Sequence, residues 1–302
     1  LCSLLVITVG ISLTAGMTSL RLADEQFASN ASAQIDRVEE LINSFLRTGE
    51  QVASALSKTP EANLPPGSLT DYTKTTDSTK MDSTKFSPAE AAMFGRLDGA
   101  RSLMPSVEIA LFGMEDGGYI KSPANSISKG YDPRTRPWYK DIIQGNKDLS
   151  ITNPYVSSST KTLVTTVSSR VKNDRGQTIG VAGVDFVLGD LTEILKSARV
   201  GSTGYLVLFD RTGKVMLDPK QPGNLMLAAQ DTKDEGLIAL AGQPAGMHHI
   251  KRGSVELVAL SRELGKTGWK AAMVMERSEE RQQAVDIITR IIVVISVLSL
   301  GI

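Results

Sequence analysis

The sequence contains very little cysteine, histidine and tryptophan. Its 302 residues include one cysteine, two histidines and two tryptophans. The single cysteine, Cys2, cannot form a disulfide within the chain, and a cysteine-based metal site is excluded. The histidines, His248 and His249, are adjacent and have no carboxylate motif at ligand spacing, so we interpret them as part of a surface turn. We therefore expect a fold that depends on its apolar core, with no metal and no cofactor.

Charge of one sign is not in excess, and motifs for catalysis are missing. Lysine plus arginine number 33, as do aspartate plus glutamate. Without a basic field, nucleic acid is not an expected partner. Nucleophile-elbow, phosphate-loop and dinucleotide-binding motifs are also missing at strand-to-helix junctions. The sequence therefore does not predict an enzyme.

Long apolar runs lie only at the two ends of the chain. Residues 1–20 carry no charge and match the roughly 20 residues that a membrane-spanning helix needs. A cleaved signal peptide is the alternative, but its basic region and small-residue cleavage site are not evident. A second apolar run follows Arg290, so we predict that a second span begins within 286–302. The long segment between the spans is sufficient for two domains.

Apolar residues recur at helical spacing after the first run. They lie three, four or seven positions apart, with polar and charged residues between them. These apolar residues are Phe27, Ile35, Val38, Leu41, Ile42, Phe45, Val52 and Leu56. The pattern predicts one long amphipathic helix over 21–58. Its apolar stripe could pack on its own domain or against a second copy in a homodimer, and the sequence does not separate these possibilities.

A strand-rich pattern occurs twice in the rest of the chain. Each half has two short strands joined by a glycine-bearing turn, followed later by two longer strands that also meet at a turn containing glycine. The predicted strands are 109–112, 119–120, 162–170 and 178–186 in the first half, and 205–209, 215–217, 254–261 and 269–275 in the second. The simplest account is duplication of one antiparallel-sheet unit.

Helix signals complete the predicted organisation. Ser87, followed by proline and by Glu90, supplies an N-cap, a first-turn proline and a capping-box acid, so a helix should begin there and end before Pro105. We predict an α+β fold with one sheet domain over 59–187, a linking helix over 188–200 and a second sheet domain over 201–280.

One segment carries a specific resemblance. Residues 131–139 read Tyr-Asp-Pro-Arg-Thr-Arg-Pro-Trp-Tyr, and Tyr155 and the sequence Gly-Val-Asp at 183–185 follow. With this combination the chain resembles the double Cache sensor domains of bacterial chemoreceptors and sensor kinases over nearly its whole length. The resemblance implies two PAS-like sheet domains between membrane-spanning helices, with residues 21–285 in the periplasm or extracellular space and the chain anchored in the bacterial inner membrane.

The resemblance also implies a ligand and the residues that bind it. It suggests the sensor of a methyl-accepting chemotaxis receptor that binds a free L-amino acid in the membrane-distal domain; a histidine kinase or a diguanylate cyclase would be the alternative output. The implied carboxylate-binding residues are Tyr131, Arg136 and Trp138, and the implied ammonium-binding residues are Tyr139, Tyr155 and Asp185. Ser157 stands where some members have an acidic residue, so it is an additional candidate.

The chemistry of these residues fits such a ligand. Pro137 disfavours helical geometry at Arg136, so we expect Arg136 and Trp138 to lie in one extended segment and to point to the same side. A guanidinium suits a carboxylate, and each such charge-assisted hydrogen bond contributes roughly 1.5 to 3 kcal/mol. Asp185 ends a strand of small apolar residues and needs a cation, because burial of an unpaired carboxylate costs several kcal/mol in order of magnitude.

That cation has two possible sources. A ligand ammonium could supply it, or Asp185 could form an internal ion pair with Arg136 or Arg170. An internal pair would favour recognition of a carboxylate without an amine. A structural ectodomain with no small ligand is a further hypothesis.

Overall fold

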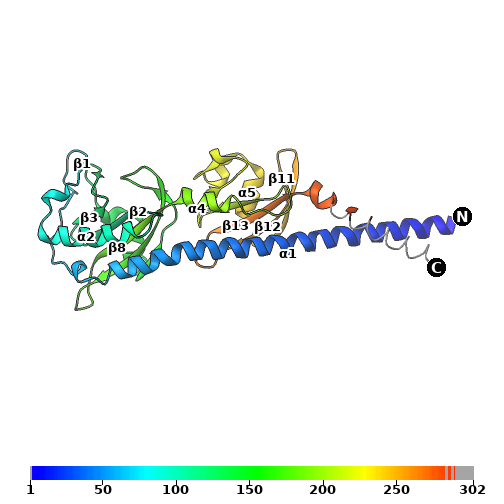
Figure 1. The fold of residues 1–302 in the computed structure, drawn as a ribbon. Coiled ribbons are helices and arrows are strands. Elements are labelled where there is room, and N and C mark those ends of the chain that lie inside the picture. Colours follow the sequence, from blue (N-terminus) through cyan, green and yellow to red (C-terminus); the bar gives the residue numbers. More distant parts are fainter. Residues whose placement is uncertain (1, 283–284, 287–288, 290–302) are drawn as a thin grey trace. The chain divides into compact units, whose positions relative to one another are not determined.

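The computed structural model describes residues 2–282, 285–286 and 289 (Figure 1). Contacts divide the chain into a central unit, Leu41–Glu193, and a terminal unit, Leu1–Glu40 together with Ile194–Ile302. Each unit contains an antiparallel sheet. The predicted α+β fold with antiparallel sheets and a long N-terminal helix is therefore confirmed.

The N-terminal helix, α1, spans Cys2–Leu56. Its buried apolar residues follow one helical stripe and are Ala23, Phe27, Ala31, Ile35, Val38, Ile42, Leu46, Ala53 and Leu56. Leu41, which the sequence pattern placed in this stripe, is 47% exposed. Consecutive helical residues point about 100° apart, so Ile42 takes the buried position and Leu41 turns outward.

The predicted membrane spans are not established by the structure. Among the described residues, no helix is both long enough and apolar enough to cross a membrane. The first predicted span, 1–20, falls within α1 apart from residue 1, whereas most of the second, 286–302, lies outside the described residues. Both spans stay predictions.

The central unit contains a six-stranded antiparallel sheet in the order β3-β2-β8-β7-β5, with β6 paired to β7. Its strands are β2 (Val107–Met114), β3 (Tyr119–Ser122), β5 (Leu149–Ile151), β6 (Tyr155–Val156), β7 (Leu163–Lys172) and β8 (Thr178–Val187). A separate two-stranded ladder joins β1 (Thr79–Lys80) to β4 (Ser126–Ile127). The short 3₁₀ helices of this unit are Pro60–Ala62, Ser83–Lys85 and Pro133–Thr135.

Helix α2 (Pro88–Ser102) begins where the sequence predicts. The hydroxyl of Ser87 accepts a hydrogen bond from the backbone N–H of Glu90 at 3.2 Å, and the Glu90 carboxylate accepts one from the N–H of Ser87 at 2.9 Å. This reciprocal pair satisfies two N–H groups that a helix start leaves unpaired. The helix ends before Pro105, as expected.

The terminal unit contains a five-stranded sheet in the order β10-β9-β13-β12-β11. Its strands are β9 (Tyr205–Phe209), β10 (Val215–Leu217), β11 (Gly246–Arg252), β12 (Val255–Glu263) and β13 (Lys270–Glu276). Helix α5 (Glu235–Gly242) contributes Leu237 and Leu240 to the apolar core of this unit. Its 3₁₀ helices are Pro222–Asn224 and Ala229–Thr232.

The interpretation of the two histidines as a surface turn is wrong. His248 and His249 lie in β11, where they pair with Ala259 and Val258 of β12. β11 is an edge strand, so polar side chains can remain partly exposed there while the backbone completes the ladder. The pairing of this segment with β12 decides its extended conformation. The local amino-acid composition does not reveal that pairing.

The repeated plan is confirmed in the strand order. The order β3-β2-β8-β7 in the central unit corresponds to β10-β9-β13-β12 in the terminal unit. The first hairpin of each unit turns at a glycine with positive φ, Gly117 at 99° and Gly213 at 80°, a backbone conformation that glycine adopts without steric cost. The outer strands β5 and β11 were not predicted.

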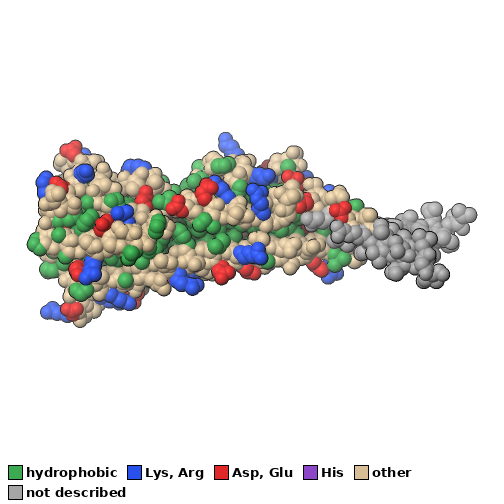
Figure 2. Space-filling view, in the orientation of Figure 1, with side chains coloured by type: hydrophobic (Ala, Val, Ile, Leu, Met, Phe, Trp, Pro, Cys, Tyr) green, Lys and Arg blue, Asp and Glu red, His purple; other side chains and the backbone are tan. Residues whose placement is uncertain are grey.

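Helix α4 spans Leu188–Leu195 and is shorter than the predicted linking helix over 188–200. Leu188, Leu191 and Leu195 are buried, as expected for its apolar face, but Ile194 is exposed. On the face shown in Figure 2, acidic and basic side chains are intermingled, in agreement with the equal numbers of the two charges.

Candidate ligand site

One face of the central sheet gathers charged and polar side chains. Asp185 on β8 lies opposite Thr166 on β7 and opposite Ile109 on β2. Two residues further along β2, Leu111 lies opposite Lys121 on β3. Residues that face each other across an antiparallel pair, and residues two apart in a strand, point to the same side. Asp185, Thr166 and Lys121 therefore share one face.

Segment 131–139 packs on this same face. The hydroxyl of Ser168 on β7 donates a hydrogen bond to the carbonyl of Trp138 at 3.0 Å. A Cβ atom placed on Gly113 of β2 would come within 2.8 Å of the Trp138 ring. The indole thus lies directly against the sheet, where the side chain of Trp138 is buried.

The expected extended segment around Arg136 is only partly correct. Arg136 has extended backbone angles, φ −82° and ψ 150°, but Trp138 lies in the first turn of α3 (Pro137–Ile143). Proline restricts the residue before it and is itself well suited to the first position of a helix. Pro137 therefore keeps Arg136 out of the helix and starts the helix that carries Trp138.

Aromatic rings surround the guanidinium of Arg136. Its Cζ lies 6.0 Å from the ring centre of Tyr131 and 5.8 Å from that of Tyr155. Tyr119 of β3 extends the cluster, with its ring centre 4.5 Å from that of Tyr131. Cation-π contacts at this range contribute about 0.5 to 2 kcal/mol. In the described part of the chain, Arg136 takes part in none of the ion pairs within 4.0 Å, so its hydrogen-bonding fork is not engaged by a carboxylate.

Asp185 is the buried acid of this face. It is 3% exposed, and its Oδ1 accepts a hydrogen bond from Thr166 Oγ1 at 2.7 Å. The hydroxyl of Tyr155 lies 2.7 Å from the same Thr166 oxygen. Burial raises the pKa of Asp185 to about 7, although the Thr166 hydrogen bond and the charges of Lys121 and Arg136 act to lower it.

The internal ion pair considered for Asp185 does not form among the described residues. Arg170 instead lies 3.4 Å from Asp148 and donates to the carbonyl of Lys147 and to Thr178. Arg136 is within electrostatic range of Asp185 but makes no ion pair with it. A guanidinium and a carboxylate are thus held near each other without direct contact.

Lys121 also belongs to this charged face and Glu108 of β2 lies within electrostatic range of it, and sequence reasoning missed both. Lys121 is fully buried and donates hydrogen bonds to the carbonyl of Ser126 at 3.0 Å and to the amide oxygen of Asn125. Burial lowers its pKa to about 8, and the charges of Asp185 and Glu108 oppose that shift. Their only sequence signal was strand alternation, which does not reveal which face is buried.

Tyr139 and Ser157 are less closely connected to Asp185. The hydroxyl of Tyr139 is buried without a hydrogen-bond partner among the described residues, and burial raises its pKa to about 12. The charges that act on it most are Glu115 and Arg134 rather than Asp185. Ser157 is buried, and its hydroxyl accepts from the N–H of Thr160 at 3.4 Å within its own turn. The site therefore brings together Tyr131, Arg136, Trp138, Tyr155 and Asp185.

Replacing Lys121 by methionine should raise the pKa of Asp185. Burial raises the pKa of Asp185, and the positive charge of Lys121 opposes this because it favours the ionised carboxylate. Without that charge, the effect of burial is larger. We expect the titration midpoint of Asp185, followed by the NMR shift of its carboxyl carbon, to move to higher pH. Lys129→Met, at an exposed lysine, should leave the midpoint unchanged. An unchanged midpoint in Lys121→Met would show that Lys121 does not act on Asp185.

Comparison with known sequences identifies the family. A sequence model of the Cache domain family, dCache_1, matches residues 17–284, which is most of the chain. The chain belongs to the Cache domain family. A relative, a probable methyl-accepting chemotaxis protein of Bacillus thuringiensis subsp. konkukian, is 28% identical over 210 residues, 67% of this Cache chain. The chain spans only 29% of the length of that relative.

Solved structures show the same fold. The ligand-binding domain of Mlp24, determined with asparagine, superimposes with a TM-score of 0.64 at 19% identity and covers 87% of this chain and 98% of its own. The ligand-binding domain of the Pseudomonas fluorescens chemoreceptor CtaA, determined with L-isoleucine, gives 0.63 at 17% identity, with 86% and 94% covered. At this level of identity the similarity establishes the Cache fold alone.

Proposed function

We propose that this Cache chain is the extracytoplasmic sensor of a transmembrane chemoreceptor and that its central unit binds a free L-amino acid. The observation that carries the proposal is the pair formed by Arg136 and Asp185. Arg136 is a cation without a carboxylate partner among the described residues. Asp185 is a buried acid that no cation of the described residues contacts. A zwitterion supplies both missing partners at once.

The proposed binding mode assigns the two ends of the ligand to opposite parts of the site. Arg136 binds the carboxylate through its guanidinium fork, and Tyr131 and Trp138 contribute their hydroxyl and indole N–H. Asp185 and Tyr155 bind the ammonium, with Thr166 orienting both through hydrogen bonds of 2.7 Å. The unpartnered hydroxyl of Tyr139 is a further proposed contact to the ammonium, and Ser157 is an additional candidate.

The proposal extends to the location and output of the protein. We place the chain in the bacterial inner membrane, with residues 21–285 on the outer side, homodimerisation through α1, and methyl-accepting chemotaxis signalling as the output. The relatives named as methyl-accepting chemotaxis proteins support that output. Ligand occupancy would then bias the equilibrium between two signalling states, as differential affinity requires.

Stabilisation by ligand tests the proposed function. At 100 times its dissociation constant, a ligand that binds only the folded state should raise the free energy of unfolding by about 2.7 kcal/mol. We expect at least one L-amino acid to produce this increase in chemical denaturation, whereas its amine-free analogue should not. Equal stabilisation by the amine-free acid would favour the carboxylate sensor, and no stabilisation by any amino acid would favour a structural ectodomain.

A further inference from the structure

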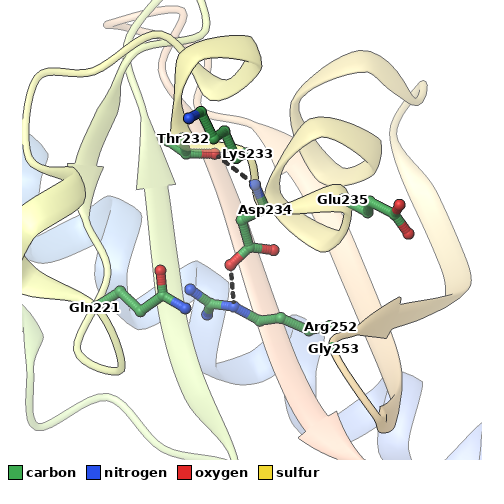
Figure 3. A pocket seen from close by; sticks show the side chains of 7 residues that line it. All are labelled: Gln221, Thr232, Lys233, Asp234, Glu235, Arg252 and Gly253. Atoms are coloured by element: carbon green, nitrogen blue, oxygen red, sulfur yellow. Dashed lines mark hydrogen bonds and ion pairs between the residues drawn. The ribbon is translucent and has the colours of Figure 1, made fainter.

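A cavity in the terminal unit is lined in part by Arg252, whose side chain is 10% exposed. Its volume is about 480 Å³, within the usual range for small-molecule sites. The residues lining it are Gln221, Thr232, Lys233, Asp234, Glu235, Arg252 and Gly253 (Figure 3). The side chains of Asp234 and Arg252 point toward each other in the wall of this cavity (Figure 3). The side chain of Lys233 points away from both (Figure 3).

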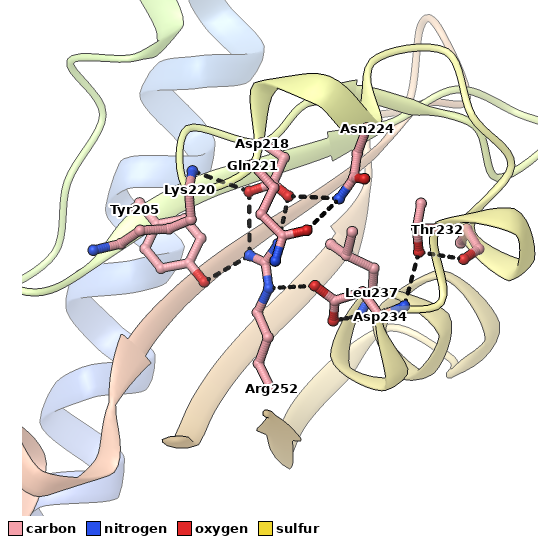
Figure 4. A network of polar contacts seen from close by, with 10 residues as sticks. Tyr205, Asp218, Lys220, Gln221, Asn224, Thr232, Asp234, Leu237 and Arg252 are labelled. Atoms are coloured by element: carbon pink, nitrogen blue, oxygen red, sulfur yellow. Dashed lines mark hydrogen bonds and ion pairs between the residues drawn. The ribbon is translucent and has the colours of Figure 1, made fainter. Parts of the chain in front are cut away.

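The donors of Arg252 are almost fully used within the protein. Nε donates to Asp234 at 2.6 Å, Nη1 donates to Tyr205 Oη and to Asp218 at 3.1 Å each, and Nη2 donates to Asp218 at 2.5 Å (Figure 4). A guanidinium has five N–H donors, so one remains. Arg252 therefore cannot offer the two-pronged fork that binds a carboxylate or phosphate.

The buried charges around Arg252 are unbalanced toward negative. The side chains of Asp218 and Asp234 are 1% and 6% exposed, and that of Arg252 is 10% exposed. Two carboxylates thus share one buried guanidinium. Lys220 is exposed and lies 5.5 Å from the ring centre of Tyr205, so its charge is mostly hydrated. A buried excess of negative charge favours a bound cation.

Asp234, which lines the cavity, keeps unused hydrogen-bond acceptor capacity. From the described part of the chain, each carboxylate oxygen of Asp234 accepts one hydrogen bond, Oδ1 from the N–H of Leu237 at 3.1 Å and Oδ2 from Arg252. A carboxylate oxygen can accept two, so both keep capacity for a ligand donor. Within the described residues, no cluster of three or more histidine, cysteine or acidic side chains is arranged to hold a metal ion. The free acceptors therefore favour an organic cation.

We propose that this cavity binds a small organic amine without a carboxylate, anchored by its ammonium on Asp234. The ligand class differs from that of the central unit, because Arg252 is neutralised by aspartates whereas Arg136 is not. This inference does not depend on amino-acid binding at Arg136 and Asp185.

Calorimetric titration of the full chain in detergent with alkylamines of one to three amino groups, 1,4-diaminobutane among them, tests the proposal. We expect saturable binding that weakens at higher salt and is not reproduced by butane-1,4-diol or succinate. Asp234→Asn should weaken binding about tenfold or more, while asparagine retains the helix cap. Gln221→Glu, which adds a negative charge at the rim, should strengthen binding.

Two control variants show whether the amine binds in this cavity. Asp185→Asn should leave amine affinity unchanged, and so should Glu263→Gln, at an exposed acid of the same unit that does not line the cavity. Binding of succinate in place of amines, no binding of any amine in the panel, or amine binding that is abolished by Asp185→Asn would overturn the proposal. The opposite effects expected for Gln221→Glu and Asp234→Asn keep the test decisive even if one variant fails to fold.

Discussion

Arg136→Ala is expected to weaken amino-acid binding about 100-fold or more. Loss of one partner from a buried, hydrogen-bonded charge pair costs about 2 to 5 kcal/mol, and a cost of about 2.7 kcal/mol, in the lower half of this range, already weakens binding about 100-fold. Arg136→Lys should recover only part of the affinity, because an ammonium cannot form the planar two-pronged contact. The measurement is calorimetric titration with whichever amino acid stabilises the wild-type protein.

The neighbouring arginine provides a matched control for this prediction. Arg134 lies two positions earlier but is paired with Asp132, with Nε 2.9 Å from Oδ1 and Nη2 2.9 Å from Oδ2. Arg134→Ala should therefore change the affinity only about twofold to threefold, as for an exposed ion pair. If Arg134→Ala abolished binding and Arg136→Ala did not, the assignment of the carboxylate site would be wrong.

Asp185→Asn should stabilise the ligand-free protein and at the same time weaken its binding of amino acids. Burial raises the pKa of this acid to about 7, whereas the unfolded chain has the ordinary value near 4. Between these values the folded state binds more protons than the unfolded state, so stability falls as pH rises from about 4 to 7 and then levels off. The cost at pH 8 is on the order of 2 to 4 kcal/mol.

The expected measurement is the free energy of unfolding by denaturant across this pH range. Asparagine cannot ionise, so the decline between pH 4 and 7 should be smaller in the variant by the contribution of Asp185, and the variant should be more stable at pH 8. Its affinity for an amino acid should fall at least about tenfold, because the ammonium loses a charged partner. Asp190→Asn, at an exposed acid, is the control. Undiminished binding by Asp185→Asn would support a ligand without an amine.

Local sequence signals were reliable where the physics is local. The capping box at Ser87 and Glu90 formed as predicted because its hydrogen bonds join residues three positions apart. Strand alternation and glycine turns located the hairpins of both units. The prediction that Trp138 lies in an extended segment was wrong. Pro137 restricts only Arg136, the residue before it, and Trp138 after it is helical.

The partners of the site residues depend on contacts between distant parts of the chain. Thr166 meets Asp185 only because β7 and β8 pair in that register. Lys121 joins them because β3 pairs with β2 on the same sheet face. A shift of one residue in the pairing of either strand would turn these side chains to the opposite face. The sequence alone does not predict which register the strands adopt.

The sequence by itself determined the repeated antiparallel plan, the start of α2 and the residues that carry the resemblance to the Cache family, since each depends on near neighbours or residue identity. Only the tertiary structure decided that Asp185 makes no ion pair with another described residue, that Lys121 is buried on the same sheet face and that Arg252 is neutralised beside a cavity of the terminal unit. Burial and charge balance are sums over residues brought together from separate strands, so they are settled only when the chain has folded.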